Sequence, residues 1–446
     1  MNDRILEILD GENININELK TMLSEMNSVD IAEILNNLEK DKLIPLFRIL
    51  PKSIASEVFA NVDSDEQQQI IEALTDTEVG EVVGKLFVDD AVDFIEEMPA
   101  NVVSRVLKNI NSEKRSIINQ ILKYPEDSAG SIMTTEYVSL RENFTVEEAF
   151  DAIRNTGLNK ETIYTCYVIS WDRVLKGVVT AKDLFLAEPN EKLSEIMVPN
   201  PVSASTIDDR EAVAALFQRY GFLAMPVVDR EERLVGIITV DDIVEVIVEE
   251  TTEDIEKMAA LTPSEESYMK TGVLRHSGNR ILWLLFLMLS ATITGSIITG
   301  FENSLMVLPV LMSFIPMLMN TAGNAGSQAS VLMIRGLALG EIGFKDIFTV
   351  LWREIRVALL CGIALAAVNF VRIYIMHGRD LFLCLTVSVS LIATVLMAKT
   401  VGCVLPLLAK KMKIDPAIMA APLITTIADA ASLLVYFSAA TIILHI

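Results

Sequence analysis

Short apolar runs recur at nearly even intervals through the first part of the chain. Eight of them lie between residues 31 and 122 and begin at positions 31, 43, 54, 68, 79, 91, 102 and 115. The joints between them hold Asp, Ser or Pro, which are typical of helix starts. Because one such unit cannot bury its apolar face alone, the pattern predicts an all-α array of stacked helices, right-angled or superhelical.

A duplication occupies residues 130–248. The stretch SIMTTEYVSL returns as EIMVPNPVSA, and VLKGVVTAKDLF returns as RLVGIITVDDIV. Each copy carries strand-like runs such as YTCYVIS and AMPVV, then a Gly–strand–Thr–x–x–Asp turn into a helix. The pattern predicts an α+β pair. The repeated I-M opening and G-x-x-T-x-x-D element resemble a tandem CBS (Bateman) module.

From Ile281 onward, apolar runs long enough to cross a bilayer take over. We expect five spans, over 281–300, 305–334, 347–374, 381–409 and 416–445. The polar, glycine-bearing stretch NTAGNAGSQAS interrupts the second span. Because such a stretch cannot face lipid, it must line a cavity or pack on protein.

Charge separates the same two parts of this 446-residue chain. Residues 1–270 hold 53 acidic and 25 basic side chains, a net charge of −28, whereas residues 271–446 hold 7 and 12, a net charge of +5. We therefore expect an acidic soluble region joined to a membrane domain. The predicted domains are a helical-repeat domain (1–125), the tandem CBS module (126–248), a connecting helix with a stop at Thr262–Pro263 (249–275) and five transmembrane helices (276–446).

Basic residues predict the orientation of the spans. They precede span 1, surround the connection between spans 2 and 3 and follow span 4, whereas the 1–2 loop FENS has none. The start of the chain, MNDRILEILDGENINI, lacks the apolar core of a signal peptide. We expect a multi-pass protein of the cell (inner) membrane with its N-terminus cytoplasmic and its C-terminus outside. The basic residues are Lys270, Arg275, Arg280, Arg335, Lys345, Arg353, Arg356, Lys410, Lys411 and Lys413, with Arg372 and Arg379 as exceptions.

The sequence gives little support to disulfide bonds, a zinc site or enzymatic chemistry. The cysteines (Cys166, Cys361, Cys384 and Cys403) form no CxxC pair, so neither a disulfide framework nor a zinc site is indicated. The chain has three histidines and no HExxH, G-x-S-x-G or P-loop motif, which argues against a membrane enzyme. We expect no enzymatic activity and no nucleic-acid partner.

The order of these regions, with three motifs, resembles the MgtE family of magnesium channels and transporters over essentially the whole chain. The motifs are YPEDSAGSIMTTEYV at the CBS entry, PMLMNTAGNAGSQASVLMIRGLA in span 2 and KIDPAIMAAPLITTIADAASLLVYF in the final helix. The resemblance implies a homodimer in the lipid bilayer that lets Mg²⁺ enter the cytosol. It also implies cytoplasmic domains that sense internal Mg²⁺ and close the pore.

Asp429 lies in the middle of the last apolar run, where a charged side chain costs roughly 2.5–3.5 kcal/mol. It could form a hydrogen bond between helices, with Lys399 as its partner, or it could serve transport. Mg²⁺ keeps several waters and is usually held by one or two carboxylates. On the dimer axis implied by the resemblance, two copies of Asp429 would balance the charge of one ion.

Small and polar residues are expected to complete the path of the ion. Helical spacing places Ala421 and Thr425 on the same face as Asp429. The alternative interpretation is close helix packing through small residues. One departure from the family pattern is Ala322, which stands where the family usually has a second glycine before the signature asparagine. By resemblance, the candidates are Asn320, Gly323, Asn324 and Gln328 in span 2 and Ala417, Ala421, Pro422 and Thr425 in span 5.

A second, regulatory metal site is expected in the cytoplasmic part. Taken alone, FVDDAVDFIEEMP is an amphipathic helix with an acidic cap, and VDDIVEVIVEETTEDIEKM is an acidic run typical of a solvated face. However, acids one turn apart repel each other, and so much negative charge needs counter-ions to compact. In one family position that holds an acid, this chain has Gly221. By resemblance, the sensing acids are Glu57, Asp89, Asp93, Asp209, Glu211, Asp242, Glu245, Glu250, Glu253 and Asp254.

The hypothesis for gating is a population shift. Mg²⁺ bound at acid pairs holds the helical and CBS domains together, moves the connector and closes the pore. ATP is a further candidate ligand, because Asp183 and Asp242 occupy the turn position that contacts ribose in nucleotide-binding CBS modules. Two other functions stay open: an exchanger coupling Mg²⁺ to Na⁺ or H⁺, and a scaffold that recruits a partner.

Overall fold

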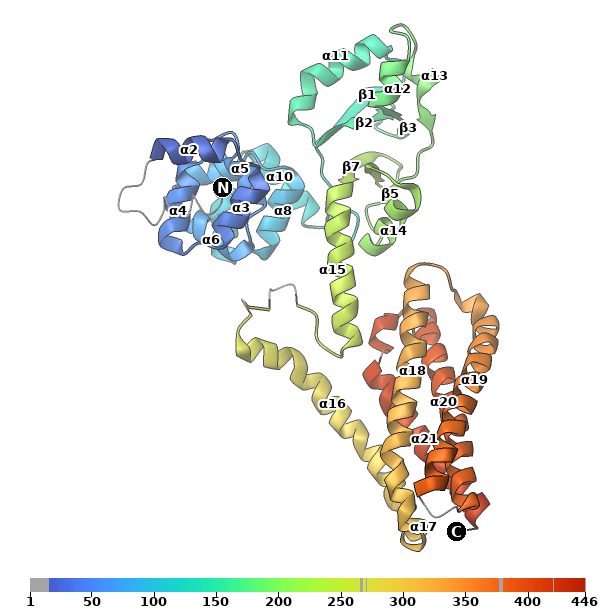
Figure 1. Ribbon diagram of the computed structural model, residues 1–446. Helices are drawn as coiled ribbons and strands as arrows, with labels where there is room; N and C mark the ends of the chain where they lie inside the picture. Colours follow the sequence, from blue (N-terminus) through green and yellow to red (C-terminus); the bar gives the residue numbers. More distant parts are fainter. Residues whose placement is uncertain (1–15, 265–267, 270, 377–379, 420, 446) are drawn as a thin grey trace. The chain divides into compact units, whose positions relative to one another are not determined.

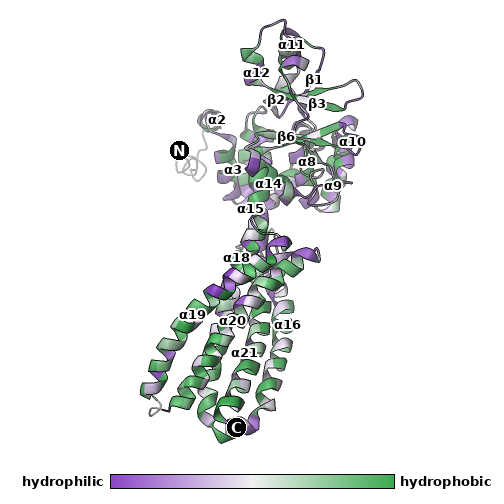
Figure 2. Ribbon diagram, turned by 90° about the vertical axis from the view of Figure 1, so that its right-hand side faces the viewer, coloured by the Kyte–Doolittle hydropathy of each residue, from purple (hydrophilic) through white to green (hydrophobic). Residues whose placement is uncertain are grey.

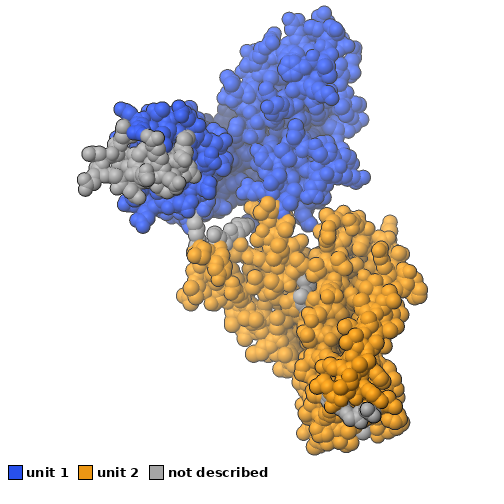
Figure 3. Space-filling model, viewed as in Figure 1, with its two compact units in different colours: residues 1–247 blue, residues 248–446 orange. Residues whose placement is uncertain are grey.

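The chain divides into two compact units, residues 1–247 and 248–446 (Figure 3). The computed structural model describes residues 16–264, 268–269, 271–376, 380–419 and 421–445. Residues 1–15 of the predicted helical domain, and Lys270 and Arg379 of the orientation argument, lie outside the described residues. The domain boundaries at residues 125, 248 and 275 stay predictions.

The predicted stacked helices are confirmed in the first unit (Figure 1). All eight are present, most of them beginning a few residues before the apolar run that predicted them, and a further helix precedes them. Apolar side chains such as Phe59 and Phe94 meet edge to face in their core. The helices are α2 (Ile16–Ser24), α3 (Ser28–Asn36), α4 (Lys40–Ile49), α5 (Ala55–Ala60), α6 (Ser64–Ala73), α7 (Asp76–Val83), α8 (Val88–Glu97), α9 (Ala100–Asn109) and α10 (Ser112–Ile121).

The duplication gives two small sheets, with strand orders β1-β2-β3-β4 and β5-β6-β7. In each, the first pair is parallel and the second antiparallel. The two hairpin turns bond to each other, because Leu234 N donates to Arg173 O at 2.9 Å. The elements are β1 (Tyr137–Arg141), α11 (Val146–Thr156), η1 (Gly157–Asn159), β2 (Thr162–Ile169), β3 (Leu175–Thr180), α12 (Ala181–Leu186), α13 (Leu193–Ile196), β4 (Val198–Pro199), β5 (Ala204–Ser205), α14 (Arg210–Tyr220), β6 (Ala224–Val228) and β7 (Leu234–Thr239).

The helical array and the second CBS copy share one apolar core. Phe94 and Ile118 of the array belong to the same buried cluster as Phe217 and Ile243 of the second copy. The first CBS copy has a separate cluster, which includes Val168. This shared core fixes α8 close to the last helix of the CBS pair, and it thereby brings their acidic faces together.

Helix α15 (Val240–Met258) runs from the second CBS copy into the connector without a break. The predicted stop at Thr262–Pro263 is wrong by several residues. The helix ends earlier because Ala260 adopts a left-handed conformation (φ 55°), and Leu261 N donates back to Glu256 O at 2.9 Å. Such a bond closes the end of a helix without proline.

Four described helical segments of the second unit are long and apolar enough to cross a membrane, and the green of their ribbons in Figure 2 marks their many hydrophobic residues. They are Val273–Gly300 (α16), Phe344–Met376 (η3, Phe344–Asp346, then α19, Ile347–Met376), Leu381–Lys411 (α20) and Pro416–Leu444 (η4, Pro416–Met419, then α21, Ala421–Leu444). The predicted second span (305–334), which corresponds mainly to α18 (Ile315–Ala338), is not among them, so the count of five is not confirmed. Leu318 and Ala322 of α18 are nevertheless fully buried.

The predicted interruption of the second span is wrong, because α18 continues through NTAGNAGSQAS. The irregular part comes before it, in α17 (Glu302–Val307) and η2 (Pro309–Phe314). The glycines permit close helix contact rather than a break. A Cβ on Gly326 would lie 2.7 Å from Ile424 Cγ2, and a Cβ on Gly402 would lie 2.3 Å from Gly326 O. Small residues of this kind let helix backbones approach each other in membranes.

Candidate functional site

The first candidate site is a group of carboxylates where α8 meets the start of α15. We call Asp89 and Asp93 on α8 with Asp242 and Glu245 on α15 the α8–α15 acid cluster. Asp89 is only 7% exposed. The Thr239 hydroxyl donates to Asp242 Oδ2 at 2.5 Å and so holds this carboxylate at the first turn of α15. The structure therefore brings four of the ten predicted regulatory acids together.

Burial and mutual repulsion raise the pKa values of this region. Burial, followed by the charge of Asp242, raises the pKa of Asp93 to about 8 and that of Asp89 well above its usual range. Burial, opposed by the Thr239 hydroxyl, raises the pKa of Asp242 to about 6. These carboxyls thus resist being ionised together, so Asp93 keeps its proton for most of the time at neutral pH, and a cation would favour the ionised forms by taking the place of the protons.

Two carboxylates of this region were missed by sequence reasoning. Burial raises the pKa of Asp90 to about 6. Burial and the charge of Asp242 raise the pKa of Glu161, which precedes β2, to about 8. Glu161 Oε2 is buried and has no hydrogen-bond partner in the described part of the chain. Asp90 stands beside a predicted acid and could have been found, whereas Glu161 belongs to no periodic pattern.

Lys114 on α10 is the buried cation next to these acids. Its ammonium donates to the carbonyl oxygens of Leu86 and Gly84, the latter at 3.4 Å. Burial lowers its pKa, and the charges of Glu136, Asp90 and Asp89 oppose that effect. One ammonium cannot balance so many carboxylates, so the region keeps an excess of negative charge.

The donor set suits a hydrated cation better than a bare one. Among the described residues, no three His, Cys, Asp or Glu side chains are arranged to hold one metal ion directly. Mg²⁺ keeps several of its waters and needs only one or two carboxylates. The unpartnered oxygen of Glu161 and the facing pair of Asp93 and Asp242 fit that requirement.

A second acidic group lies in the second unit, at the end of α15. The Lys257 ammonium is 2.6 Å from Glu253 Oε1 and 2.7 Å from Asp415 Oδ2. Burial and the charge of Asp415 raise the pKa of Asp254 to about 6, and Glu250 adds to the effect. Asp415 was missed, because it is an isolated acid between two apolar runs. The structure thus joins Glu250, Glu253 and Asp254 to a loop of the membrane region.

The remaining predicted acids make local contacts. Glu57 accepts a hydrogen bond from the Ser28 hydroxyl at 2.9 Å. Asp209 caps α14 by accepting from the backbone nitrogen of Glu211 at 2.9 Å. Gly221 ends the same helix in a left-handed conformation (φ 66°), which explains why glycine stands there in place of an acid.

Asp429 lies on α21 and is partly buried. Its Oδ1 atom is buried without a hydrogen-bond partner among the described residues. The suggested pairing with Lys399 is wrong, because the Lys399 ammonium lies 3.6 Å from Glu354 Oε2 on α19. Asp429 therefore has an acceptor oxygen available for a cation.

The residues expected beside Asp429 fall into three groups. Asn320, Asn324 and Gln328 form an exposed stripe with a spacing of four along α18, and Asn324 Nδ2 donates to Asn320 Oδ1 at 3.2 Å. Gly323 lies against Thr425, since a Cβ there would stand 2.9 Å from Thr425 Cγ2. The other three candidates lie at or before the start of α21. Ala417 is fully buried in η4, before α21 begins, and Pro422 lies in the first turn of α21. The side chain of Ala421 lies outside the described residues.

The two positions expected to contact a nucleotide both cap helices. Asp183 Oδ2 accepts from the Thr180 hydroxyl at 2.6 Å at the start of α12, as Asp242 does from Thr239. Asp242 also belongs to the acid cluster, where the charge would repel phosphate groups. Asp183 is therefore the better candidate of the two.

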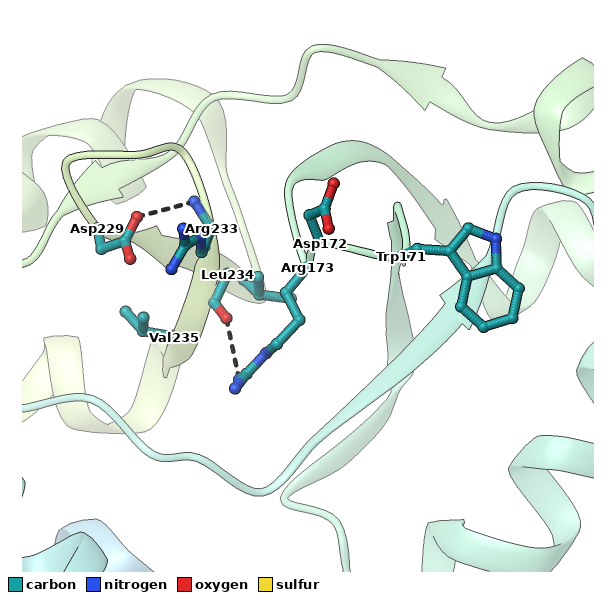
Figure 4. Close-up of a pocket in the computed structure, with 7 residues that line it drawn as sticks. All are labelled: Trp171, Asp172, Arg173, Asp229, Arg233, Leu234 and Val235. Carbon is teal, nitrogen blue, oxygen red and sulfur yellow. Dashed lines mark hydrogen bonds between the residues drawn. The ribbon is translucent and has the colours of Figure 1, made fainter.

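A pocket of about 410 Å³ lies at the two hairpin turns of the CBS pair (Figure 4). Arg173 donates to Leu234 O at 3.2 Å, Asp229 Oδ1 accepts from Arg233 N at 3.0 Å, and the Trp171 ring points away from the other lining residues. None of the predicted site residues lines this pocket.

The comparisons with known proteins agree over all three regions. Residues 315–439 match the MgtE family of divalent cation transporters, residues 26–127 match the MgtE intracellular N domain, and residues 129–190 and 193–249 match the CBS domain. The magnesium transporter MgtE of Thermus thermophilus is 38% identical over 74% of this chain and 73% of its own length. The Bacillus subtilis magnesium transporter MgtE is 36% identical over 74% and 72%.

A solved structure supports the same assignment. The soluble part of a magnesium transporter aligns with 56% of this chain and 97% of that structure, with a TM-score of 0.52 and 28% identity. Helical array, CBS pair and apolar helices thus occur here in one chain whose sequence matches these relatives over most of its length. The chain belongs to the MgtE family of magnesium transporters.

Proposed function

We propose that this protein is a Mg²⁺-selective channel that admits the ion to the cytosol and is closed by cytosolic Mg²⁺. It works as a homodimer in the cell (inner) membrane. The single observation that carries this proposal is the free carboxylate oxygen of Asp429, because an unpaired acid among apolar helices marks an ion path by default.

The proposed permeation rests on the balance between the charge of Mg²⁺ and that of the Asp429 carboxylates. Two copies of this carboxylate on a dimer axis supply a charge of −2, which one Mg²⁺ neutralises. The ion keeps most of its waters, so the carboxylates contact it through them. The polar stripe of Asn320, Asn324 and Gln328 can accept and donate hydrogen bonds to that hydration shell.

Closure follows from the acids of the first unit. Without Mg²⁺, the carboxylates of the α8–α15 acid cluster repel each other and oppose the packing of α8 on α15. Bound Mg²⁺ removes the repulsion and shifts the population towards the packed state. Helix α15 carries Asp242 near its start and Asp254 near its end, so in this proposal one continuous helix passes the signal from the cluster along the chain to the acids beside Asp415.

Five crossings with the N-terminus inside and the C-terminus outside complete the proposal. The burial of Leu318 and Ala322 supports α18 as a further crossing helix, because one face of it packs on the other helices of this unit. At one end of the bundle, Lys410 donates to Leu337 O at 2.8 Å and Lys411 lies 4.3 Å from the centre of the Phe344 ring. This gathering of basic residues supports that end as the cytoplasmic one.

ATP is proposed as an additional ligand of the CBS pair, beside Asp183. Both hydrogen bonds from Thr180 go to Oδ2 of this carboxylate, so the proposal assigns the ribose hydroxyl to Oδ1. ATP would bring a charge-dense polyphosphate to this acidic unit and would bind together with Mg²⁺.

The proposal is tested with the full-length protein in liposomes that contain a Mg²⁺-sensitive dye. A channel admits Mg²⁺ down its own gradient without any Na⁺ or H⁺ gradient, and entry slows when Mg²⁺ is raised on the side of the acidic unit. Entry that requires an opposing Na⁺ or H⁺ gradient would replace the channel by an exchanger. Entry that ignores Mg²⁺ on that side would remove the proposed closure.

A further inference from the structure

A buried ion pair lies between two membrane helices, away from the sites described above. The Lys399 ammonium of α20 is 3.6 Å from Glu354 Oε2 of α19. Within the described part of the second unit, these are the buried charged residues, with 6% and 9% exposure. Lys399 lies about 18 Å of helix before Lys411, well inside the apolar run. Ionisable residues in such places are rare and usually functional.

The pair lies directly behind the helices that carry the proposed pore. Ala358 on α19, Ala398 on α20 and Ala428 on α21 belong to one buried cluster with Ala322 and Ala325 of α18. Ala398 precedes Lys399, Ala428 precedes Asp429, and Ala358 follows Glu354 by one turn. Glu354, Lys399 and Asp429 therefore lie next to the same buried cluster of alanine side chains.

Contacts of α20 with α18 keep Lys399 close to the path. A Cβ on Gly326 would lie 3.3 Å from Ala398 O, and a Cβ on Gly402 would collide with Gly326 O. A single ammonium so near the path would repel a divalent ion and compete with it for Asp429. Its effect is strong because the surroundings have a low dielectric constant.

We propose that Glu354 is a positioning residue for Mg²⁺ entry, because it holds the Lys399 ammonium in an ion pair and leaves the charge of Asp429 uncompensated. Glu354 does not contact the ion and acts through Lys399. The inference rests on the proposed channel function. A pair kept only to join α19 to α20 is the competing explanation, since breaking any buried pair is destabilising.

The two explanations predict different effects of the two single substitutions on the Mg²⁺ concentration for half-maximal entry. Glu354→Gln leaves an unpaired positive charge, which raises the Mg²⁺ concentration for half-maximal entry by about tenfold or more. Lys399→Met leaves an extra acid, which does not raise that concentration. The double variant Glu354→Leu/Lys399→Met removes both charges and stays within about threefold of the wild type, because apolar residues can replace a buried pair.

The experiment compares Mg²⁺ entry into liposomes for these four proteins, using only preparations that elute as the same assembly and unfold at similar temperatures. The proposal is supported when Glu354→Gln raises the Mg²⁺ concentration for half-maximal entry, Lys399→Met does not, and the double variant stays close to the wild type. Equal losses in the two single variants, whether or not the double variant recovers, would overturn it and leave a purely structural pair. Unchanged entry in Glu354→Gln would also overturn it. A wild type that admits no Mg²⁺ would instead remove the channel function itself.

Discussion

The α8–α15 acid cluster and the membrane region both hold buried carboxylates in the described part of the chain, and these differ in their surroundings. In the α8–α15 acid cluster, the charge of Asp242 raises the cost of ionising both Asp89 and Asp93. In the membrane region, the Oδ1 atom of Asp429 has no hydrogen-bond partner among the described residues, while Glu354 pairs with Lys399. The first place gathers negative charge, and the second isolates a single one.

The difference teaches how one ion can serve two roles. In the proposed function, a group of repelling acids binds Mg²⁺ with a large conformational consequence, because the ion decides whether two elements pack together. In the same proposal, a single acid per subunit binds the ion without such a consequence, so that the ion can leave again. Sensing therefore needs several coupled carboxylates, and permeation needs few.

The largest effect is expected from Asp429→Asn. Since the carboxylate reaches Mg²⁺ through water, its loss lowers entry by about a hundredfold, at the upper end of the range for groups just outside a metal's direct ligands. Asp380→Asn is the matched control, because Asp380 caps α20 through bonds that asparagine also makes. Liposome entry is measured for both, and equal entry would make Asp429 a structural residue.

A large loss is also expected from Gly402→Ala, which tests the rigid packing around the path. The new Cβ would stand 2.3 Å from Gly326 O, a backbone atom that cannot move aside alone. The bundle loses roughly 1–3 kcal/mol of stability, typical of overpacking. Gly295→Ala on α16 is the control, since nothing lies within 4 Å of its Cβ position. Thermal unfolding in detergent distinguishes the two, and equal midpoints would refute the close contact.

A moderate effect is expected from Asp89→Asn together with Asp93→Asn. Removing two of the repelling charges mimics bound Mg²⁺, so residues 1–247 resist trypsin in the full-length protein even without the ion. We expect the ratio of the cleavage rates without and with Mg²⁺ to be about tenfold smaller in this variant than in the wild type, which is the free energy of one pKa unit. The control is Asp30→Asn with Asp65→Asn, which changes two exposed acids of α3 and α6. Greater cleavage in the α8 variant would contradict the repulsion.

A smaller effect is expected from pH. Asp90 and Asp242 have pKa values of about 6, and Asp93 and Glu161 of about 8, all above the usual values near 4. The folded unit therefore holds more protons than the unfolded chain between about pH 4 and pH 8, and its stability falls as pH rises through that window. Mg²⁺ then replaces the lost protons.

We accordingly expect Mg²⁺ to protect residues 1–247 from trypsin severalfold more at pH 8 than at pH 6 (about threefold to tenfold). Cleavage of a denatured substrate at each pH corrects for the activity of the protease. Stronger protection at pH 6 would mean that the ion does not compete with protons at these carboxylates.

The parts of the fold that could be predicted are those with local signals. The regular joints between apolar runs predicted α3–α10, and AMPVV coincides with β6. The continuity of α18 could not be predicted, because Gly326 functions through its contacts with Ile424 and Gly402 on other helices. Without knowing those neighbours, the polar glycine stretch had the pattern of a break.

The candidate sites divide along the same line. Asp89, Asp93 and Asp242 lie in acidic runs that the sequence makes visible. Glu161 and Asp415 are isolated acids, and only the packing of β2 and of the α20–α21 loop brings them to the others. The pairing of Lys399 with Glu354 rather than Asp429 likewise depends on which faces of α19 and α20 meet.

One titration tests most directly whether the two kinds of carboxylate site are coupled. Mg²⁺ on the side of the acidic unit is raised stepwise in liposomes while trypsin protection of residues 1–247 and dye-reported Mg²⁺ entry are recorded on the same vesicles. The account predicts that protection increases and entry decreases over the same concentration range. Protection that is complete while entry continues unchanged would contradict it.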